Sequence, residues 1–233
     1  MDDHSLRVLE FARVLDLLAA GKHAHAMRRF DAGQVCLDIG ANGGQSALEF
    51  GRLRPDARIA SFEANPDNLT DLRIVNHILG RRHEFHHVAL SDKAGSIVLH
   101  IPLVRNTPVP GEASLHPEVF DNVQDRLGPI TGVLKHTVAA RTLDSFGLAP
   151  DFVKIDVQGH EPAVLRGMIN TLKQHRPGVM LENGGSFEDI RAFLSDLGYA
   201  IFTFDPRSDT LHAVDRPDTV NFIALPQGAG TGR

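Results

Sequence analysis

The segment Val35–Phe50 constrains the fold more than any other stretch of the chain. An apolar run interrupted only by Asp38 has the length of a buried strand, and Gly40, Gly43 and Gly44 follow it closely. Apolar residues then recur at helical spacing. A strand that passes through glycines into a helix start brings free backbone N–H groups and the positive end of a helix dipole to one place. The segment therefore predicts a βα unit that binds a nucleotide-like ligand at its turn.

A second anchor follows at the end of the next predicted strand, residues 58–62. Glu63 stands there, 25 positions after Asp38, and a carboxylate in this place can hold both hydroxyls of a ribose. The glycine loop reads G-A-N-G-G-Q, so Asn42 replaces the glycine that admits a pyrophosphate in dinucleotide-binding loops. The loop also lacks the G-K-[ST] ending of a P-loop. Asp38 beside the ligand would repel phosphate and suit a cationic amino-acid group.

Together these features resemble motifs I and II of class I S-adenosylmethionine (SAM) methyltransferases. The alternative is a βα turn in a flavodoxin-like or Rossmann domain with another ligand or none. In the class I fold the residues just beyond the third strand usually flank the adenine, which adds part of the VALSD segment to the site. The predicted cofactor-binding residues are Asp38, Gly40, Asn42, Gly43, Gln45, Ser46, Glu63, Ala64, Ala89, Leu90, Ser91 and Asp156.

Later segments make the resemblance more specific. From about residue 35 to 204 the chain resembles the FkbM family of SAM-dependent methyltransferases, through LDIGANGGQS, SFEANP, VALSD, TLD, VKIDVQGHEPAVLRG and LENGG in this order. SFEANP departs from the family's usual EP pair but keeps Glu63. Gln158 stands where the family often has glutamate, so we do not expect an indispensable base at that position.

The resemblance implies an α/β, Rossmann-like class I methyltransferase fold. It implies a seven-stranded, mostly parallel sheet with an antiparallel last strand and helices on both faces. The implied reaction is methyl transfer from SAM to an oxygen of a sugar, a polyketide or a related small metabolite.

Three parts of the chain are expected to differ in their organisation. We expect residues 1–32 to form an N-terminal helical extension, with helices over 5–20 and 23–30. These helices would form either a lid over the ligand or a dimer surface. Residues 33–226 form the methyltransferase domain. The tail 227–233 is too rich in glycine to pack.

Within the domain, residues 102–132 are rich in proline, with a short helix expected over 117–126. An insert of this length is more often functional than idle, and we interpret it as the acceptor-binding flap rather than a mobile surface excursion. Residues 96–101 are expected to pair with the strand before them, and 205–217 to form a loop. The further strands are predicted over 84–90, 135–140, 152–157, 179–182, 199–204 and 219–225, and the further helices after Pro66, over 161–172 and over 187–197.

Methyl transfer to a hydroxyl requires an aligned acceptor oxygen and a base. Ligands in open α/β sheets bind beyond the carboxyl ends of the strands, which points to Asp156, His160 and Glu182 as catalytic candidates. His160 titrates nearest to neutral pH, but it would also suit a helix cap. Asp156 and Glu182 end apolar strands, where a carboxylate is costly without a purpose. With His160 they would also suit a divalent cation such as Mg²⁺.

Composition narrows the partners. The net charge of −5 and the pI near 6.2 argue against nucleic acid as a main partner. The sequence has no run of about 18 apolar residues, which is the length that a membrane-spanning helix requires. The acidic N-terminus differs from a basic signal sequence, so we expect a cytoplasmic protein that acts on a small hydroxylated molecule, with a homodimer left open. The single cysteine, Cys36, excludes an internal disulfide and suits buried packing. Two other functions stay open: a nicotinamide-dependent oxidoreductase, which Asn42 disfavours, and a non-catalytic SAM-binding domain.

Overall fold

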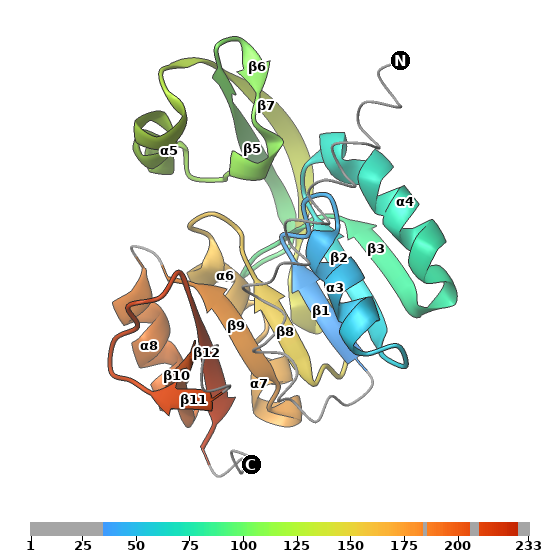
Figure 1. Ribbon diagram of the computed structural model, residues 1–233, viewed down its shortest axis with the longest axis vertical. Coiled ribbons are helices and arrows are strands. Elements are labelled where there is room, and N and C mark those ends of the chain that lie inside the picture. Colours follow the sequence, from blue (N-terminus) through green and yellow to red (C-terminus); the bar gives the residue numbers. More distant parts are fainter. Residues whose placement is uncertain (1–34, 184–185, 206–209, 228–233) are drawn as a thin grey trace.

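A mixed eight-stranded sheet forms the body of the domain (Figure 1). The computed structural model describes residues 35–183, 186–205 and 210–227. Five parallel neighbours run in the order β3, β2, β1, β8 and β9. Three antiparallel pairings then add β12, β10 and the edge strand β11. These strands are β1 (Val35–Ile39), β2 (Arg58–Glu63), β3 (His83–His87), β8 (Phe152–Ile155), β9 (Gly178–Glu182), β10 (Tyr199–Asp205), β11 (Thr210–Ala213) and β12 (Asn221–Pro226).

The predicted class I fold is confirmed: the seven strands from β3 to β10 in the order of the sheet include the antiparallel last strand, β12, inserted between β9 and β10. The eighth, β11, lies in the segment that we expected to be a loop. It pairs with β10 from Phe202 to Asp205.

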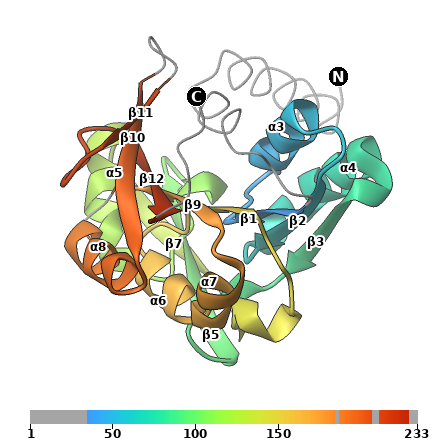
Figure 2. The same cartoon turned by 90° about the horizontal axis from the view of Figure 1, so that it is seen from below.

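Helices cover both faces of this sheet (Figure 2). One face carries α3 (Gln45–Leu53) and α4 (Leu69–Leu79), and the other carries α6 (Glu161–Arg166), α7 (Ile169–His175) and α8 (Phe187–Asp196). The strand side chains alternate between these two layers. On β1, Cys36 packs in the core beneath α3 and α4, and Leu37 in the core beneath the other helices. Burial on both faces is why these strands are almost wholly apolar.

A second sheet stands beyond the first as a separate lobe (Figure 1). Its order is β4 (Ala89–Leu90), β7 (Ile130–Arg141), β5 (Gly95–Val104) and β6 (Thr107–Pro108). The β5–β7 ladder extends from the pair Gly95 and Ala140 to the pair Val104 and Ile130. The connection carries η3 (Pro110–Glu112), η4 (Pro117–Val119) and α5 (Phe120–Leu127). We call residues 102–132 the insert.

The expected partner of residues 96–101 was wrong. β5 pairs with β7, which lies after the insert, because the two residues of β4 are too few to match a ten-residue strand. Alternating polarity along β5 identifies a half-buried strand without specifying its neighbour. Residues 84–90 likewise divide between β3 and β4, which belong to different sheets.

The helix expected over 161–172 divides into α6 and α7. Gly167 lies at the break, where a Cβ atom would approach the carbonyl oxygen of Ser91 to 2.0 Å. On α4, Leu72, Val75 and Leu79 are buried in the core, whereas Ile78 is 56% exposed. Short 3₁₀ turns complete the fold at η1 (Pro66–Asn68), η2 (Gly80–Arg82) and η5 (Leu143–Phe146).

The helices expected over 5–20 and 23–30, and the tail from residue 228, lie outside the described residues. Among the helices that the structure does describe, none is long and apolar enough to span a membrane.

Candidate active site

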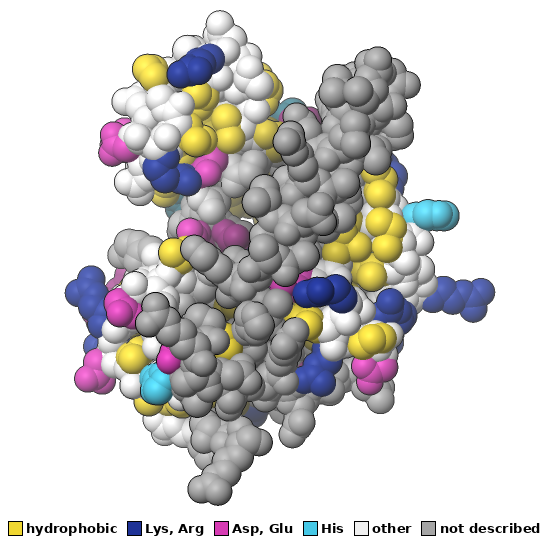
Figure 3. All heavy atoms as spheres, in the orientation of Figure 1, with side chains coloured by type: hydrophobic (Ala, Val, Ile, Leu, Met, Phe, Trp, Pro, Cys, Tyr) yellow, Lys and Arg dark blue, Asp and Glu magenta, His cyan; other side chains and the backbone are white. Residues whose placement is uncertain are grey.

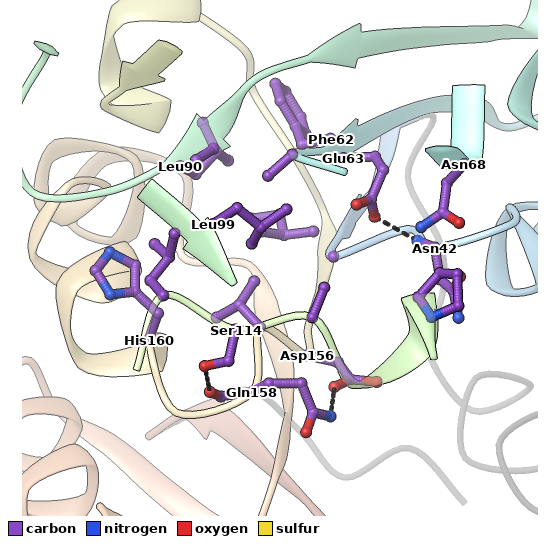
Figure 4. A pocket seen from close by; sticks show the side chains of 18 of the residues that line it. Asn42, Phe62, Glu63, Asn68, Leu90, Leu99, Ser114, Asp156, Gln158 and His160 are labelled. Carbon is purple, nitrogen blue, oxygen red and sulfur yellow. Dashed lines mark hydrogen bonds between the residues drawn. The ribbon is translucent and has the colours of Figure 1, made fainter. Parts of the chain in front are cut away.

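The carboxyl ends of β1, β2 and β8 open into a cavity that we call the Glu63 cavity (Figure 4). The glycine loop and the residues after β8 form one side of it, and the insert covers another. Its volume is about 90 Å³, which is less than the ~300 Å³ of a small ligand-binding pocket. Its walls are Ile39, Gly40, Asn42, Phe62, Glu63, Ala64, Asn68, Val88, Ala89, Leu90, Leu99, Pro110, Gly111, Ala113, Ser114, Leu115, Asp156, Val157, Gln158 and His160.

Glu63 is fixed at this cavity by two backbone groups. Its Oε2 accepts a hydrogen bond of 2.6 Å from the N–H of Asn42, and its Oε1 accepts one of 2.6 Å from the N–H of Asn65. Burial raises the pKa of Glu63, while these two N–H groups act in the opposite direction. Each carboxylate oxygen keeps a lone pair for another donor. Such a preorganised carboxylate can receive two neighbouring hydroxyls, as the sequence predicts.

The glycines of the loop make room for the protein itself. Gly40 has φ +74°, and a Cβ atom there would lie 1.8 Å from the carbonyl oxygen of Asp156. Gly44 has φ +86°, and a Cβ atom there would lie 2.8 Å from the side chain of Val75 on α4. The sequence argument assigned this space to the ligand. The structure corrects it, because these two glycines let the loop pack against β8 and let α3 pack against α4.

We expected Asp38 to face the ligand crevice, but it does not. It is fully buried, and its Oδ1 lies 3.3 Å from Nζ of Lys154, its neighbour across the β1–β8 pair. Lys154 also donates a 3.0 Å hydrogen bond to the carbonyl oxygen of Gly40 and lies 3.6 Å from Oδ2 of Asp156. Burial alone would lower the pKa of Lys154, but Asp38 and Asp156 outweigh it and raise that pKa. We expected a cationic group of the ligand beside Asp38. The side chain of Lys154 supplies that positive charge instead.

Lys154 is a site residue that the sequence reasoning missed, although a signal was present. Asp38 and Lys154 are each a charged residue within an apolar strand, and two such strands paired in register must bring the charges together. The pair holds the Gly40 loop from beneath.

A second opening, the Lys154 cavity, continues from the first. Its volume is about 260 Å³, and it shares Gly40, Asn42 and Asp156 with the Glu63 cavity. The predicted residues Gln45 and Ser46, at the start of α3, line it, whereas Gly43 lines neither cavity. Together the two cavities form one crevice from α3 to β4. The full lining is Gly40, Ala41, Asn42, Gln45, Ser46, Lys154, Ile155, Asp156, Met180 and Asn221.

His160 lies at the far end of the Glu63 cavity from Asn42 (Figure 4). Its Nε2 is 3.0 Å from Oγ of Ser91, and its Nδ1 is 3.0 Å from Nε2 of His116 in the insert. Burial and the nearby His116 lower the pKa of His160 to about 4. Ser91 contacts His160 rather than the cavity, while Ala89 and Leu90 line the cavity wall. His160 precedes α6, but its side chain makes no capping hydrogen bond.

Glu182 faces a third and larger opening, the Glu182 cavity, between α5 of the insert and α8. Its volume is about 460 Å³. Arg126 on α5 donates a 2.8 Å hydrogen bond to Glu112 and forms an ion pair with it. Burial, then Asp156, Glu161 and Glu112, raise the pKa of Glu182 to about 7. The lining is Glu112, Val119, Asn122, Val123, Arg126, Gln158, Gly159, Glu161, Glu182, Asn183, Ser186, Ile190 and Val220.

Acidic side chains are visible in the hollow between the insert lobe and the body of the domain (Figure 3). Of the three predicted catalytic residues, the structure brings Asp156 and Glu182 together through Gln158. Nε2 of Gln158 lies 3.2 Å from Oδ1 of Asp156 and 3.4 Å from Oε2 of Glu182. His160 makes its contacts with Ser91 and His116 instead. Within the described ranges, no cluster of three or more His, Cys, Asp or Glu side chains is arranged to hold a metal ion.

Comparisons with known proteins agree with this geometry. The model of the methyltransferase FkbM domain matches residues 38–201, which is more than half of the chain. A crystal structure of methyltransferase FkbM from Methylobacillus flagellatus KT has 16% sequence identity and a TM-score of 0.53. That match covers 83% of this chain and 43% of the other, so the present chain spans less than half of that protein's length.

A precorrin-6y C5,15-methyltransferase from Geobacter metallireducens GS-15 has 16% identity and a TM-score of 0.44, over 87% of this chain and 83% of the other. At that score it adds nothing to the assignment of the fold. No curated protein sequence matches the chain.

Proposed function

Because the chain belongs to the FkbM methyltransferase family, we propose that it transfers the methyl group of SAM to a hydroxyl of a small metabolite. The observation that carries this proposal is the meeting of two cavities at one side chain. The Glu63 cavity suits an adenosyl compound, the Glu182 cavity suits an acceptor, and Gln158 lines both. A methyl group aligned between two such sites requires little further help from the protein.

The residues of the crevice fit the cofactor. The carboxylate of Glu63 can accept hydrogen bonds from the two ribose hydroxyls, and the apolar side chains of Val88, Leu90 and Leu99 suit an adenine ring. The Lys154 cavity, at the start of α3, offers a polar wall for the amino-acid portion. The cofactor supplies an electrophilic methyl group on a sulfonium.

Glu182 is the best-placed general base. A hydroxyl is a weak nucleophile, and a base works best when its pKa lies near the working pH. The pKa of Glu182 is raised to about 7, and its side chain faces the acceptor cavity. Both ring nitrogens of His160 already contact protein side chains, and the pKa of His160 is lowered to about 4. We therefore assign proton removal to Glu182, and we place Asp156 on the cofactor side of the reacting atoms.

Two experiments test the proposed function. Calorimetric titration with S-adenosylhomocysteine should show one binding site on the wild-type protein, and the absence of binding would end the proposal. A screen of sugars, polyketides and other hydroxylated metabolites with radiolabelled SAM, with and without EDTA, should then find an acceptor and show whether a metal is required. Label transferred only to amines or carbon atoms would reject methylation of oxygen.

A further inference from the structure

We propose that Gln158 is a positioning residue: its amide holds Asp156 and Glu182 in register with each other, and its backbone ties the insert to the reaction centre. The catalytic meaning of this role depends on the proposed function, but the contacts themselves can be measured without any substrate. Among the described residues Gln158 alone lines both the Glu63 cavity and the Glu182 cavity.

The side chain of Gln158 lies between two carboxylates. Its Nε2 carries two N–H donors, and it lies 3.2 Å from Asp156 and 3.4 Å from Glu182. Two carboxylates this near a shared partner repel each other unless a donor or a cation stands between them. The amide of Gln158 occupies the position that a small cation would take. Donation to each carboxylate fixes the direction in which that carboxylate points.

The backbone of Gln158 is held in a conformation that suits few residues. Its φ is +51°, in the left-handed region, where a non-glycine residue persists only if its surroundings enforce it. Oε1 of the buried Glu161 accepts hydrogen bonds from the N–H groups on either side, those of Val157 and Gly159. This carboxylate therefore clamps the turn that aims the Gln158 amide at its two partners.

The insert reaches the same turn from the other side. Oγ of Ser114 donates a 2.7 Å hydrogen bond to the carbonyl oxygen of Gln158, and it accepts one of 3.0 Å from the N–H of His116 (Figure 4). Ser114 is itself buried. The insert, which covers the Glu63 cavity, and the two carboxylates thus all contact one residue, Gln158.

The first test is the titration of Glu182, followed by carbon-13 NMR of its carboxyl group. Gln158→Asn keeps an amide and tolerates the left-handed backbone, but its shorter side chain cannot reach Glu182. We expect the pKa of Glu182 to rise from about 7 to about 8 in this variant, because a donor to the charged form is lost. The groups that also face Glu182 are Asp156, Glu161, Glu112 and Arg126, and all remain in place.

Gln174→Ala, at an exposed position on α7, is the matched control and should leave that pKa unchanged. If the pKa is unchanged in Gln158→Asn as well, the amide does not support Glu182 and the proposal fails. A cooperative urea unfolding transition in Gln158→Asn shows that the variant is folded. The absence of S-adenosylhomocysteine binding in the wild type would defeat the proposed function without changing the titration result.

The second test converts the amide into a third carboxylate. Gln158→Glu should place three carboxylates around one point and create a divalent-cation site there, because oxygen ligands suit such ions. Mn²⁺ titration followed by electron paramagnetic resonance should show at least a tenfold gain in affinity over wild type. No gain would mean that the side chain at position 158 does not lie between Asp156 and Glu182, which would overturn the proposal.

Discussion

The two sides of the reaction centre are built from the chain in different ways. The Glu63 cavity takes Asn42, Glu63 and Asn68 from two neighbouring strand–helix connections, and the insert and the residues after β8 complete it. The Glu182 cavity combines the insert with residues from 158 to 220. The part of the first cavity around Glu63 is therefore determined by short local motifs, whereas the second cavity depends on where a long connection folds back.

Their electrostatics differ in the same sense. On the cofactor side each buried carboxylate has a dedicated partner: Asp38 has Lys154, and Glu63 has two backbone N–H groups. On the acceptor side burial and the neighbouring carboxylates raise the pKa of Glu182 to about 7. Charges that are neutralised in place support a fixed binding site, whereas a perturbed carboxylate beside a cavity is typical of catalysis.

The largest expected effect lies on the acceptor side. Glu182→Gln keeps the shape of the side chain but removes the base, so turnover of an acceptor should fall by ~10²–10⁴-fold. Steady-state rates at saturating acceptor measure it, and binding of S-adenosylhomocysteine serves as the control for an intact cofactor side. Full turnover in this variant would show that Glu182 is not the general base and that the base lies in another region.

Two glycines that line the Glu63 cavity, one in the loop after β1 and one in the insert, give the next contrast, this time in stability. Gly40→Ala forces a Cβ atom to within 1.8 Å of a backbone oxygen at a positive φ, and should lower the free energy of unfolding by about 3 kcal/mol or more. Gly111→Ala, in the insert, meets only the Asn42 side chain at 3.3 Å and should cost about 1 kcal/mol at most. Urea melts of both variants measure these changes in the free energy of unfolding. Equal losses would contradict the tight packing of the loop at Gly40.

Glu63→Ala should weaken the binding of S-adenosylhomocysteine by about 100-fold. The variant loses the acceptor for the ribose hydroxyls and leaves the N–H groups of Asn42 and Asn65 without their partner. Calorimetry measures the affinity. Asp67→Ala, which alters an exposed residue on the nearby η1, is the control. An unchanged affinity for Glu63→Ala would remove the ribose assignment.

The smallest effect is a pH dependence of stability that originates at Glu182. Its pKa is raised from 4.5 to about 7, so the folded state binds the extra proton between these values. Stability from this group is therefore greatest below pH 4.5 and is lost as the pH rises through 7. After discounting for partial exposure, Glu182→Gln should gain about 1 kcal/mol relative to wild type between pH 5 and pH 8.

Urea melts of wild type and Glu182→Gln at both pH values measure this difference, and other titrating groups cancel between the two proteins. The same difference at pH 5 and pH 8 would show that Glu182 has an ordinary pKa.

The same division governs what could be predicted from the sequence. The strands around Val35–Phe50, Glu63 and the position of Asp156 follow from periodicity and strand-end rules. The β5–β7 pairing could not be predicted, because Ile97 and Val138 pair through a register that alternation does not specify. The role of Lys154 could have been predicted, because it is a charged residue within an apolar strand. Gln158 was set aside as a non-base, since its contacts depend on a left-handed turn and on the insert.

A crystal structure with bound S-adenosylhomocysteine tests the central claim most directly. We predict the ribose hydroxyls on Glu63, the amino-acid portion in the Lys154 cavity, and the sulfur directed past Gln158 toward Glu182. Because the Glu63 cavity holds only about 90 Å³, residues 110–115 of the insert should lie farther from Asn42 than they do without the ligand. A sulfur that faces away from the Glu182 cavity, or a ribose bound elsewhere, would contradict the account.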